Sequence, residues 1–221
     1  GELSTIGLPP YMANLIVSET PAPSGTEFVG AVFSPLRPYG GSAWFPASQA
    51  AHDRFGADVA AADVENAAVL RSGEWTVLQR VGALPGSAKS TPQYSDAANS
   101  VVSQDKLVKL PLGLLWFGGP HTDKVLPRHG HGPSPQVAGG RLIIEGPDML
   151  RAVDVYTGRV LWERELEDVG KYYNITSHFP GAGEIGSNYV SFPDYVYVVY
   201  GSRILARDAA TGETSREFVL E

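Results

Sequence analysis

The chain has 221 residues and a formal net charge of −7, with 43% hydrophobic and 19% charged residues. This composition is that of an ordinary globular protein with a real core. The acidic balance, without any cluster of Lys and Arg, argues against nucleic-acid binding. The complete absence of cysteine excludes disulfides, thiolate zinc sites, c-type haem attachment and cysteine nucleophiles. No apolar run reaches the length of a membrane span.

The first 82 residues predict an α/β segment. An apolar run at 14–19 precedes a helix-compatible stretch at 26–36, which Pro35 must end or distort. The remaining expected elements are a strand at 43–45, an Ala-rich helix at 49–64 and a strand at 74–79. Strands that alternate with helices in this way are typical of α/β architecture.

One loop in this segment carries a family resemblance. Leu36-Arg37-Pro38-Tyr39-Gly40-Gly41 is similar to the "LRPGG"-like loop in the C-terminal half of class I, S-adenosylmethionine-dependent methyltransferases, with a tyrosine inserted. A plain turn is the alternative interpretation. The glycine-rich cofactor loop and the acidic ribose ligand that the resemblance implies would lie upstream of this stretch. Methyltransferase activity is therefore not assigned to this chain.

A stretch rich in Gly, Ser, Ala, Pro and Asn at 82–106 marks a predicted boundary between residues 1–82 and 83–221. The apolar run that follows at 112–119 is expected to be an inner or third strand of a sheet. High contents of glycine and proline, 25 and 17 residues, favour a turn-rich β architecture for the rest. We therefore expect a mainly β protein with an α/β N-terminal part.

Residues 141–162 organise the second part as a strand, a turn, a strand, a second turn and a third strand. Residues 195–212 repeat this pattern, which aligns Asp154 with Asp208 and Thr157-Gly158 with Thr211-Gly212 at a spacing of 54 residues. Several short strands in each unit at such a period are typical of propeller blades. Both aspartates are expected to accept hydrogen bonds from backbone amides in their turns.

The motif A-x-D-x-x-T-G-x-x-x-W, ending at Trp162, resembles the blade motif of the PQQ-like, or quinoprotein-type, β-propellers. In that family the Trp docks one blade on its neighbour; Arg216 replaces it in the second copy. The stretch 94–100 resembles the entry into such propellers. The whole layout, a methyltransferase-like segment running into blades, resembles large multidomain proteins of planctomycete-type bacteria.

This resemblance implies about two blades of an incomplete propeller, with a chain that stops within a blade at Glu221. Exposed sheet faces would then need the remaining blades or another subunit as partners. Families with such blades are usually extracytoplasmic, so a periplasmic location is expected. PQQ with calcium is a cofactor only for a complete propeller of eight blades.

One stretch in the second part carries candidate chemistry. His129 and His131 lie two residues apart beside Arg128, so in an extended chain both imidazoles would point the same way, as in His-x-His metal sites. His121 and His178 could add nitrogen ligands, and Asp123 could add oxygen. The alternatives are an anion or substrate held by Arg128 with the histidines, or a connector without a ligand.

The residues 167–190 form a long polar and aromatic insertion between the two repeats. Its aromatic side chains are expected to pack under their own loop rather than to form a binding surface.

The leading functional hypothesis is a binding or scaffold propeller segment of a larger extracytoplasmic protein, because the recognisable residues are all structural. The alternatives are a quinoprotein-like oxidoreductase of the PQQ-dependent dehydrogenase type, and a metal or small-ligand site at the Arg128–His131 loop. Whether the chain is an enzyme stays open at this stage.

Overall fold

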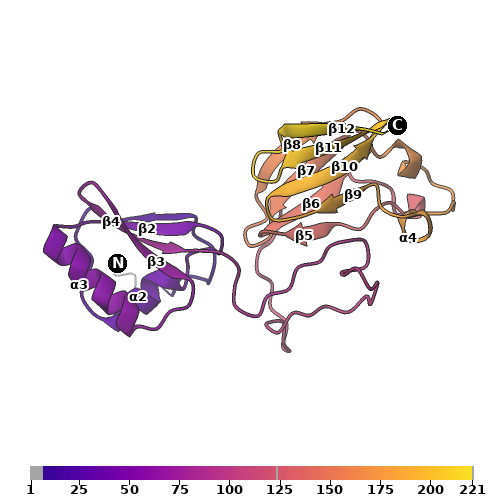
Figure 1. Cartoon of the computed structure of the whole chain (residues 1–221). Helices are drawn as coiled ribbons and strands as arrows, with labels where there is room; N and C mark the ends of the chain where they lie inside the picture. Colours follow the sequence, from indigo (N-terminus) through magenta and orange to yellow (C-terminus); the bar gives the residue numbers. More distant parts are fainter. Residues whose placement is uncertain (1–6, 123, 221) are drawn as a thin grey trace. The chain divides into compact units, whose positions relative to one another are not determined.

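The structure is a computed structural model that describes residues 7–122 and 124–220, with the side chain of Arg128 left out. The described residues are mainly β, with twelve strands in three four-stranded sheets and few helices (Figure 1). The chain divides into two compact units, Gly1–Pro85 and Gly86–Glu221. None of the helices in the described part has the length and apolar character needed to cross a membrane.

The first unit is a mixed sheet with two helices. Its strands are β1 (Leu15–Val17), β2 (Gly41–Pro46), β3 (Ala67–Ser72) and β4 (Trp75–Arg80), and its helices are α2 (Thr26–Phe33) and α3 (Gln49–Ala61). The strand order is β1-β2-β4-β3, in which β1 pairs parallel to β2 and the other pairs are antiparallel. The predicted helices and the strand at 74–79 are confirmed, whereas β3 was not predicted.

Local signals explain both helices. Helix α2 ends at Phe33, directly before Ser34 and Pro35, as the proline predicts. Helix α3 begins after Ser48, whose side chain accepts a hydrogen bond from the backbone N–H of Ala51 at 3.3 Å. The apolar faces of the helices and of β2 and β4 bury a common core, which includes Val29, Val32, Phe33, Leu36, Ala43, Phe45, Phe55, Val59 and Leu78.

The second unit contains two antiparallel sheets whose strands follow one another in chain order. The first sheet is β5 (Gln136–Ala138), β6 (Arg141–Glu145), β7 (Met149–Asp154) and β8 (Val160–Glu165). The second sheet is β9 (Tyr189–Ser191), β10 (Tyr195–Tyr200), β11 (Arg203–Asp208) and β12 (Thr214–Val219). Both sheets therefore have four strands.

Three strands of each sheet repeat at a constant spacing. Strands β6, β7 and β8 begin 54 residues before β10, β11 and β12, which is the spacing predicted from the turn motif. The register shifts between Ala152 and Val153 in the first sheet, and at the equivalent step between Ala206 and Arg207 in the second. A bulge at the same position in both copies shows that the repeat extends to backbone geometry.

The two sheets pack face to face through a shared apolar core. Buried residues from both sheets form it: Ile143, Leu150, Ala152, Trp162, Leu166, Tyr189, Val196, Val198, Leu205 and Ala209. At the first strands, the buried amide of Gln136 donates to the carbonyl of Tyr189 at 3.0 Å and accepts from the N–H of Ser191 at 2.8 Å. The Gln136 side chain therefore links β5 to β9 by hydrogen bonds to the backbone of β9.

The remaining chain of the second unit is mostly irregular. Residues 86–135 contain a short 3-10 helix, η1 (Arg128–Gly130), and the predicted strand at 112–119 is absent. The insertion between the sheets carries a second 3-10 turn, η2 (Lys171–Tyr173), and one short helix, α4 (Ala182–Ile185). The insertion ends earlier than predicted, because β9 begins at Tyr189.

Candidate functional site

The loop around His129 and His131 is not extended. Residues Arg128–Gly130 form the 3-10 turn η1, and His131 has a positive φ of 48°. The predicted His-x-His geometry, with both imidazoles aligned by an extended chain, is therefore wrong. At Gly130 the loop lies so close to the insertion that a Cβ atom would stand 1.7 Å from the carbonyl oxygen of Tyr173. The loop turns sharply so that its backbone can approach the insertion this closely.

A third histidine from the insertion brings the imidazoles together. The ring centroid of His178 lies 5.0 Å from that of His129 and 5.1 Å from that of His131, with edge-on geometry in both pairs. His178 Nδ1 and His131 Nε2 are 3.3 Å apart. We call His129, His131 and His178 the histidine cluster. All three side chains are exposed to solvent.

Backbone contacts fix His131 within the cluster. Its carbonyl accepts a hydrogen bond of 2.9 Å from the N–H of Ala182, at the start of α4. A Cβ atom on Gly181 would lie 2.2 Å from the Cβ of His131, so only glycine permits this approach. The strained φ of His131 is thus imposed by packing between the loop and the insertion.

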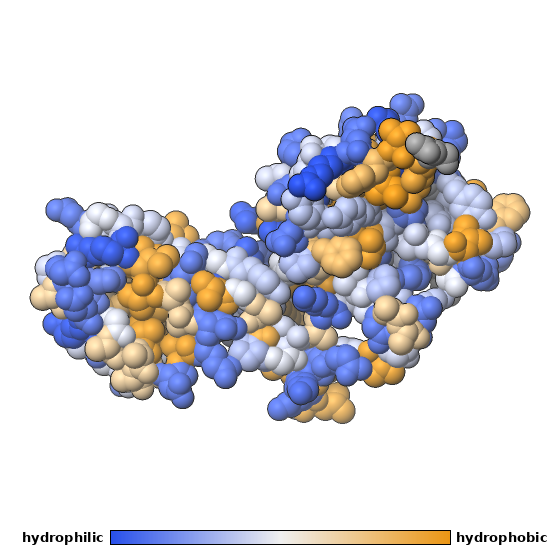
Figure 2. Space-filling view, in the orientation of Figure 1, coloured by the Kyte–Doolittle hydropathy of each residue, from blue (hydrophilic) through white to orange (hydrophobic). Residues whose placement is uncertain are grey.

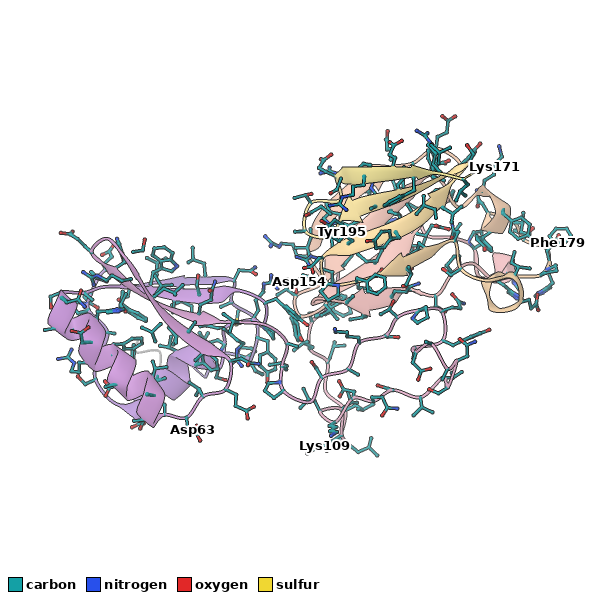
Figure 3. All side chains as sticks on the ribbon, in the orientation of Figure 1. Asp63, Lys109, Asp154, Lys171, Phe179 and Tyr195 are labelled. Atoms are coloured by element: carbon teal, nitrogen blue, oxygen red, sulfur yellow. The ribbon has the colours of Figure 1, made fainter. Side chains whose placement is uncertain are left out.

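A side-chain hydrogen bond stabilises the segment that carries His178. The hydroxyl of Tyr172 donates a hydrogen bond of 3.0 Å to the carbonyl of Pro180. Phe179, the residue next to His178, projects from this segment and is 55% exposed (Figure 3). Tyr173 and Tyr189 are buried, so the expectation that the insertion's aromatics pack holds for these two; Tyr172 and Phe179 are exposed.

A small cavity of about 230 Å³ adjoins His131. Its lining residues come from the boundary segment, the loop and α4: Gln93, Tyr94, His131, Gly132, Gly181, Gly183 and Glu184. The carboxylate of Glu184 accepts a hydrogen bond of 2.9 Å from the N–H of Gly181. The cavity therefore places an imidazole, a phenol and a carboxylate around one volume that can hold a few water molecules or a small ligand.

The other predicted ligands have different positions. Asp123 lies outside the described residues, and Arg128 is described only through its backbone in η1. The carbonyl of His121 accepts a hydrogen bond of 3.3 Å from Arg151 Nη1. Within the described part of the chain, no group of three or more His, Cys, Asp or Glu side chains is arranged to hold a metal ion.

A buried carboxyl group, which the sequence did not indicate, lies near the base of the insertion. Glu145, the last residue of β6, is only 3% exposed, and burial raises its pKa from 4.5 to about 8. Asn188 Nδ2 donates to Glu145 Oε2 at 2.7 Å and to the carbonyl of Val169 at 3.2 Å. Among the described residues, Glu145 Oε1 and Asn188 Oδ1 have no hydrogen-bond partner.

The repeated turn motif forms two closely similar turns. Asp154 Oδ1 accepts from the N–H of Tyr156 at 2.9 Å, and Asp208 Oδ1 accepts from the N–H of Ala210 at the same distance. The aspartates thus hold backbone amides, as predicted. Each turn then closes with an N–H of glycine that donates to the aspartate carbonyl at 2.8 Å, from Gly158 and from Gly212. Thr157 and Thr211 are the residues before these glycines; Thr211 Oγ1 also donates to Asp208 Oδ1 at 3.0 Å.

Trp162 of β8 contacts the turn of the neighbouring sheet. Its Nε1 donates to the carbonyl of Ala209 at 3.0 Å, and only 5% of its surface is exposed. A Cβ atom on Gly212 would lie 2.6 Å from the indole ring, so the glycine leaves room for it.

Trp116 makes the same contact with the first sheet. Its Nε1 donates to the carbonyl of Val155 at 3.0 Å, and a Cβ on Gly158 would lie 2.5 Å from its ring. The segment at 112–119 was predicted as a strand inside the first sheet. Trp116 instead lies on the turn of that sheet, in the position that Trp162 takes on the second.

No protein-family model matches the chain, and no curated protein matches it. The interpretation of the site therefore depends on its geometry and on the sequence motifs.

Proposed function

We propose that residues 83–221 are part of a PQQ-like β-propeller that acts as a binding or scaffold segment of a larger extracytoplasmic protein. The observation that carries the proposal is the repeated docking contact, in which a Trp indole donates to the carbonyl after the turn aspartate. Because the same contact occurs at both sheets, it could pack successive sheets against one another along the chain. The sequential four-stranded order of each sheet also supports this proposal.

We also propose that the first unit is the methyltransferase-like segment that precedes the blades in this layout, on the resemblance of its loop at 36–41. The loop at 36–41 ends where β2 begins, and a Cβ on Gly41 would lie 2.5 Å from the carbonyl oxygen of Arg37. A glycine is therefore required at this turn before the strand, as the resemblance implies. We propose a structural role for this unit in the chain.

A scaffold is favoured over a catalyst because the repeated residues bind backbone groups of the turns and pack the sheets against their neighbours. Asp154, Asp208 and both indoles make their hydrogen bonds to the protein's own backbone. The test is the intact mass of the protein isolated from its source, with peptide mapping of both ends. We expect a mass well above the 23.6 kDa of this chain, with further copies of the turn motif. A native mass equal to that of this chain would contradict the proposal.

The alternative is a quinoprotein-like oxidoreductase, and a separate experiment distinguishes it. The purified protein is incubated with PQQ, with and without Ca²⁺, and assayed for retained quinone and for dye-linked oxidation of an alcohol. We expect no stoichiometric retention of quinone and no dye reduction. Calcium-dependent retention together with dye reduction would replace the scaffold proposal by the oxidoreductase.

A further inference from the structure

Two imidazole nitrogens in the histidine cluster lie next to each other. His178 Nδ1 and His131 Nε2 are 3.3 Å apart, a hydrogen-bond distance at which either ring could be the donor. Zinc–nitrogen bonds are about 2.0–2.1 Å long, so tetrahedral geometry places two ligand nitrogens about 3.3 Å apart. The observed separation therefore also suits two nitrogens that share one metal ion in place of this hydrogen bond.

We propose that His131 and His178 form a two-histidine site for a divalent transition-metal ion such as Zn²⁺ or Cu²⁺. Imidazole nitrogen is a preferred ligand of both ions, and this chain has no thiolate that could compete for them. Water completes the coordination shell, for which the cavity of about 230 Å³ beside His131 provides room. With two protein ligands the site is consistent with the absence of a larger ligand group among the described residues.

The site is pre-organised, unlike a chance pair of surface histidines. His131 is held by its bond to Ala182 and by the contact with Gly181, as described above. The segment of His178 is braced by the hydrogen bond from Tyr172 to Pro180. Ligands that are fixed before binding lose less conformational freedom when the ion arrives.

His129 has a positioning role in this site. Its ring packs edge-on against His178 at an interplanar angle of 87°. This contact sets the plane of the His178 ring and therefore the direction of its Nδ1 lone pair. Replacement of His129 should lower the affinity for the metal ion without changing the number of nitrogen ligands.

The inference does not depend on the propeller proposal. The experiment uses the whole purified chain, stripped of metal with a chelator and titrated with Zn²⁺ by calorimetry and with Cu²⁺ by electron paramagnetic resonance. We expect one ion per chain and a spectrum with two coupled nitrogens. His131→Ala and His178→Ala should each reduce affinity by more than about tenfold, since each removes one of two ligands.

The matched control is His52→Ala, because His52 lies in the first unit with its Nδ1 2.8 Å from Thr76 Oγ1. Its variant should bind the ion as the wild type does. Circular dichroism confirms that each variant is folded, and His131→Gln and His178→Gln serve if an alanine variant is not. Unchanged affinity in the His131 and His178 variants, equal loss in His52→Ala, or no binding to the wild type would each overturn the proposal.

Discussion

The two sheets of the second unit have the same turn, and a tryptophan covers each turn. The two tryptophans come from different kinds of segment. On the second sheet the indole comes from Trp162, which belongs to strand β8 and is buried in the core between the sheets. On the first sheet it comes from Trp116, which lies in irregular chain and is only partly buried. The hydrogen bond to the turn is 3.0 Å long in both cases.

This difference separates two contributions to docking. The hydrogen bond and the space over the glycine depend only on the turn, because both indoles have them. Burial depends on the sheet behind the indole, because only Trp162 lies on a strand, β8, which pairs with β7. The turn therefore specifies where a tryptophan binds, and the sheet determines how much the contact stabilises the fold.

The largest expected effect is that of Trp162→Ala. Loss of a buried aromatic side chain costs about 3–5 kcal/mol, to which the lost hydrogen bond contributes. Trp116→Ala should cost clearly less, because its ring is only partly buried. Chemical denaturation of both variants measures the difference, and equal losses would contradict the assignment of stability to burial rather than to the turn.

The second prediction compares two residues that align at the 54-residue spacing in equivalent strands. Glu145 of β6 is buried, whereas the aligned Val199 of β10 is 44% exposed. Because burial raises the pKa of Glu145 from 4.5 to about 8, the folded state holds a proton that the unfolded state releases between these values. Stability should therefore fall as pH rises from 4.5 to 8, by at most about 1.4 kcal/mol per pH unit.

The Glu145→Gln variant has no titrating group at this position and keeps an amide for the contact with Asn188. Its stability should show a flatter profile over this pH range and should exceed that of the wild type above pH 8. Urea unfolding at several pH values gives both profiles. Parallel profiles for the two proteins would show that Glu145 does not carry the dependence.

A third prediction concerns the glycines under the two indoles. Gly212 and Gly158 have φ values of 73° and 70°, and a Cβ on either would collide with the ring above it. In both alanine variants the strained backbone should lower the free energy of unfolding by about 1–3 kcal/mol. Gly212→Ala should lose more, because Trp162 is held in the core whereas Trp116 can move aside. Thermal unfolding of the pair tests this order.

The smallest effect is expected at Arg216, which aligns with Trp162 and lies exposed on β12. Arg216→Ala should change the free energy of unfolding by no more than about 0.5 kcal/mol, as for most surface substitutions. The same denaturation experiment applies. A loss similar to that of Trp162→Ala would mean that Arg216 carries a docking contact within this chain.

Much of the second unit could be predicted from sequence because the residues of its turns recur at a fixed spacing. Asp154, Gly158 and their counterparts are required by backbone geometry, so they appear at a fixed spacing. Trp116 was assigned to the wrong element, since an indole that docks from irregular chain looks the same in sequence as one on a strand. Strand β3 was missed because none of its residues is fully buried and it lacks an alternating apolar pattern.

The histidine cluster could be predicted only in part. His129 and His131 lie two residues apart in sequence, but the contact of His131 with His178 spans 47 residues and depends on how the insertion folds back. The signals that were present are the glycines at 130 and 181, which permit close approach of the two segments. Glu145 was hidden because it ends an apolar strand, where a carboxylate is usually exposed.

The order of strands in the second unit has a consequence for how the chain folds. Every strand pair in its two sheets joins neighbours in sequence, so each sheet needs only short loops to close before its hydrogen bonds form. In the first unit, β4 also pairs with β2, from which helix α3 and strand β3 separate it in sequence. We expect each antiparallel sheet to form early and by itself. The burial of Trp162 against Ala209 would then be a late step that joins the two sheets into one cooperative unit, with little effect on the folding rate and a large effect on the unfolding rate.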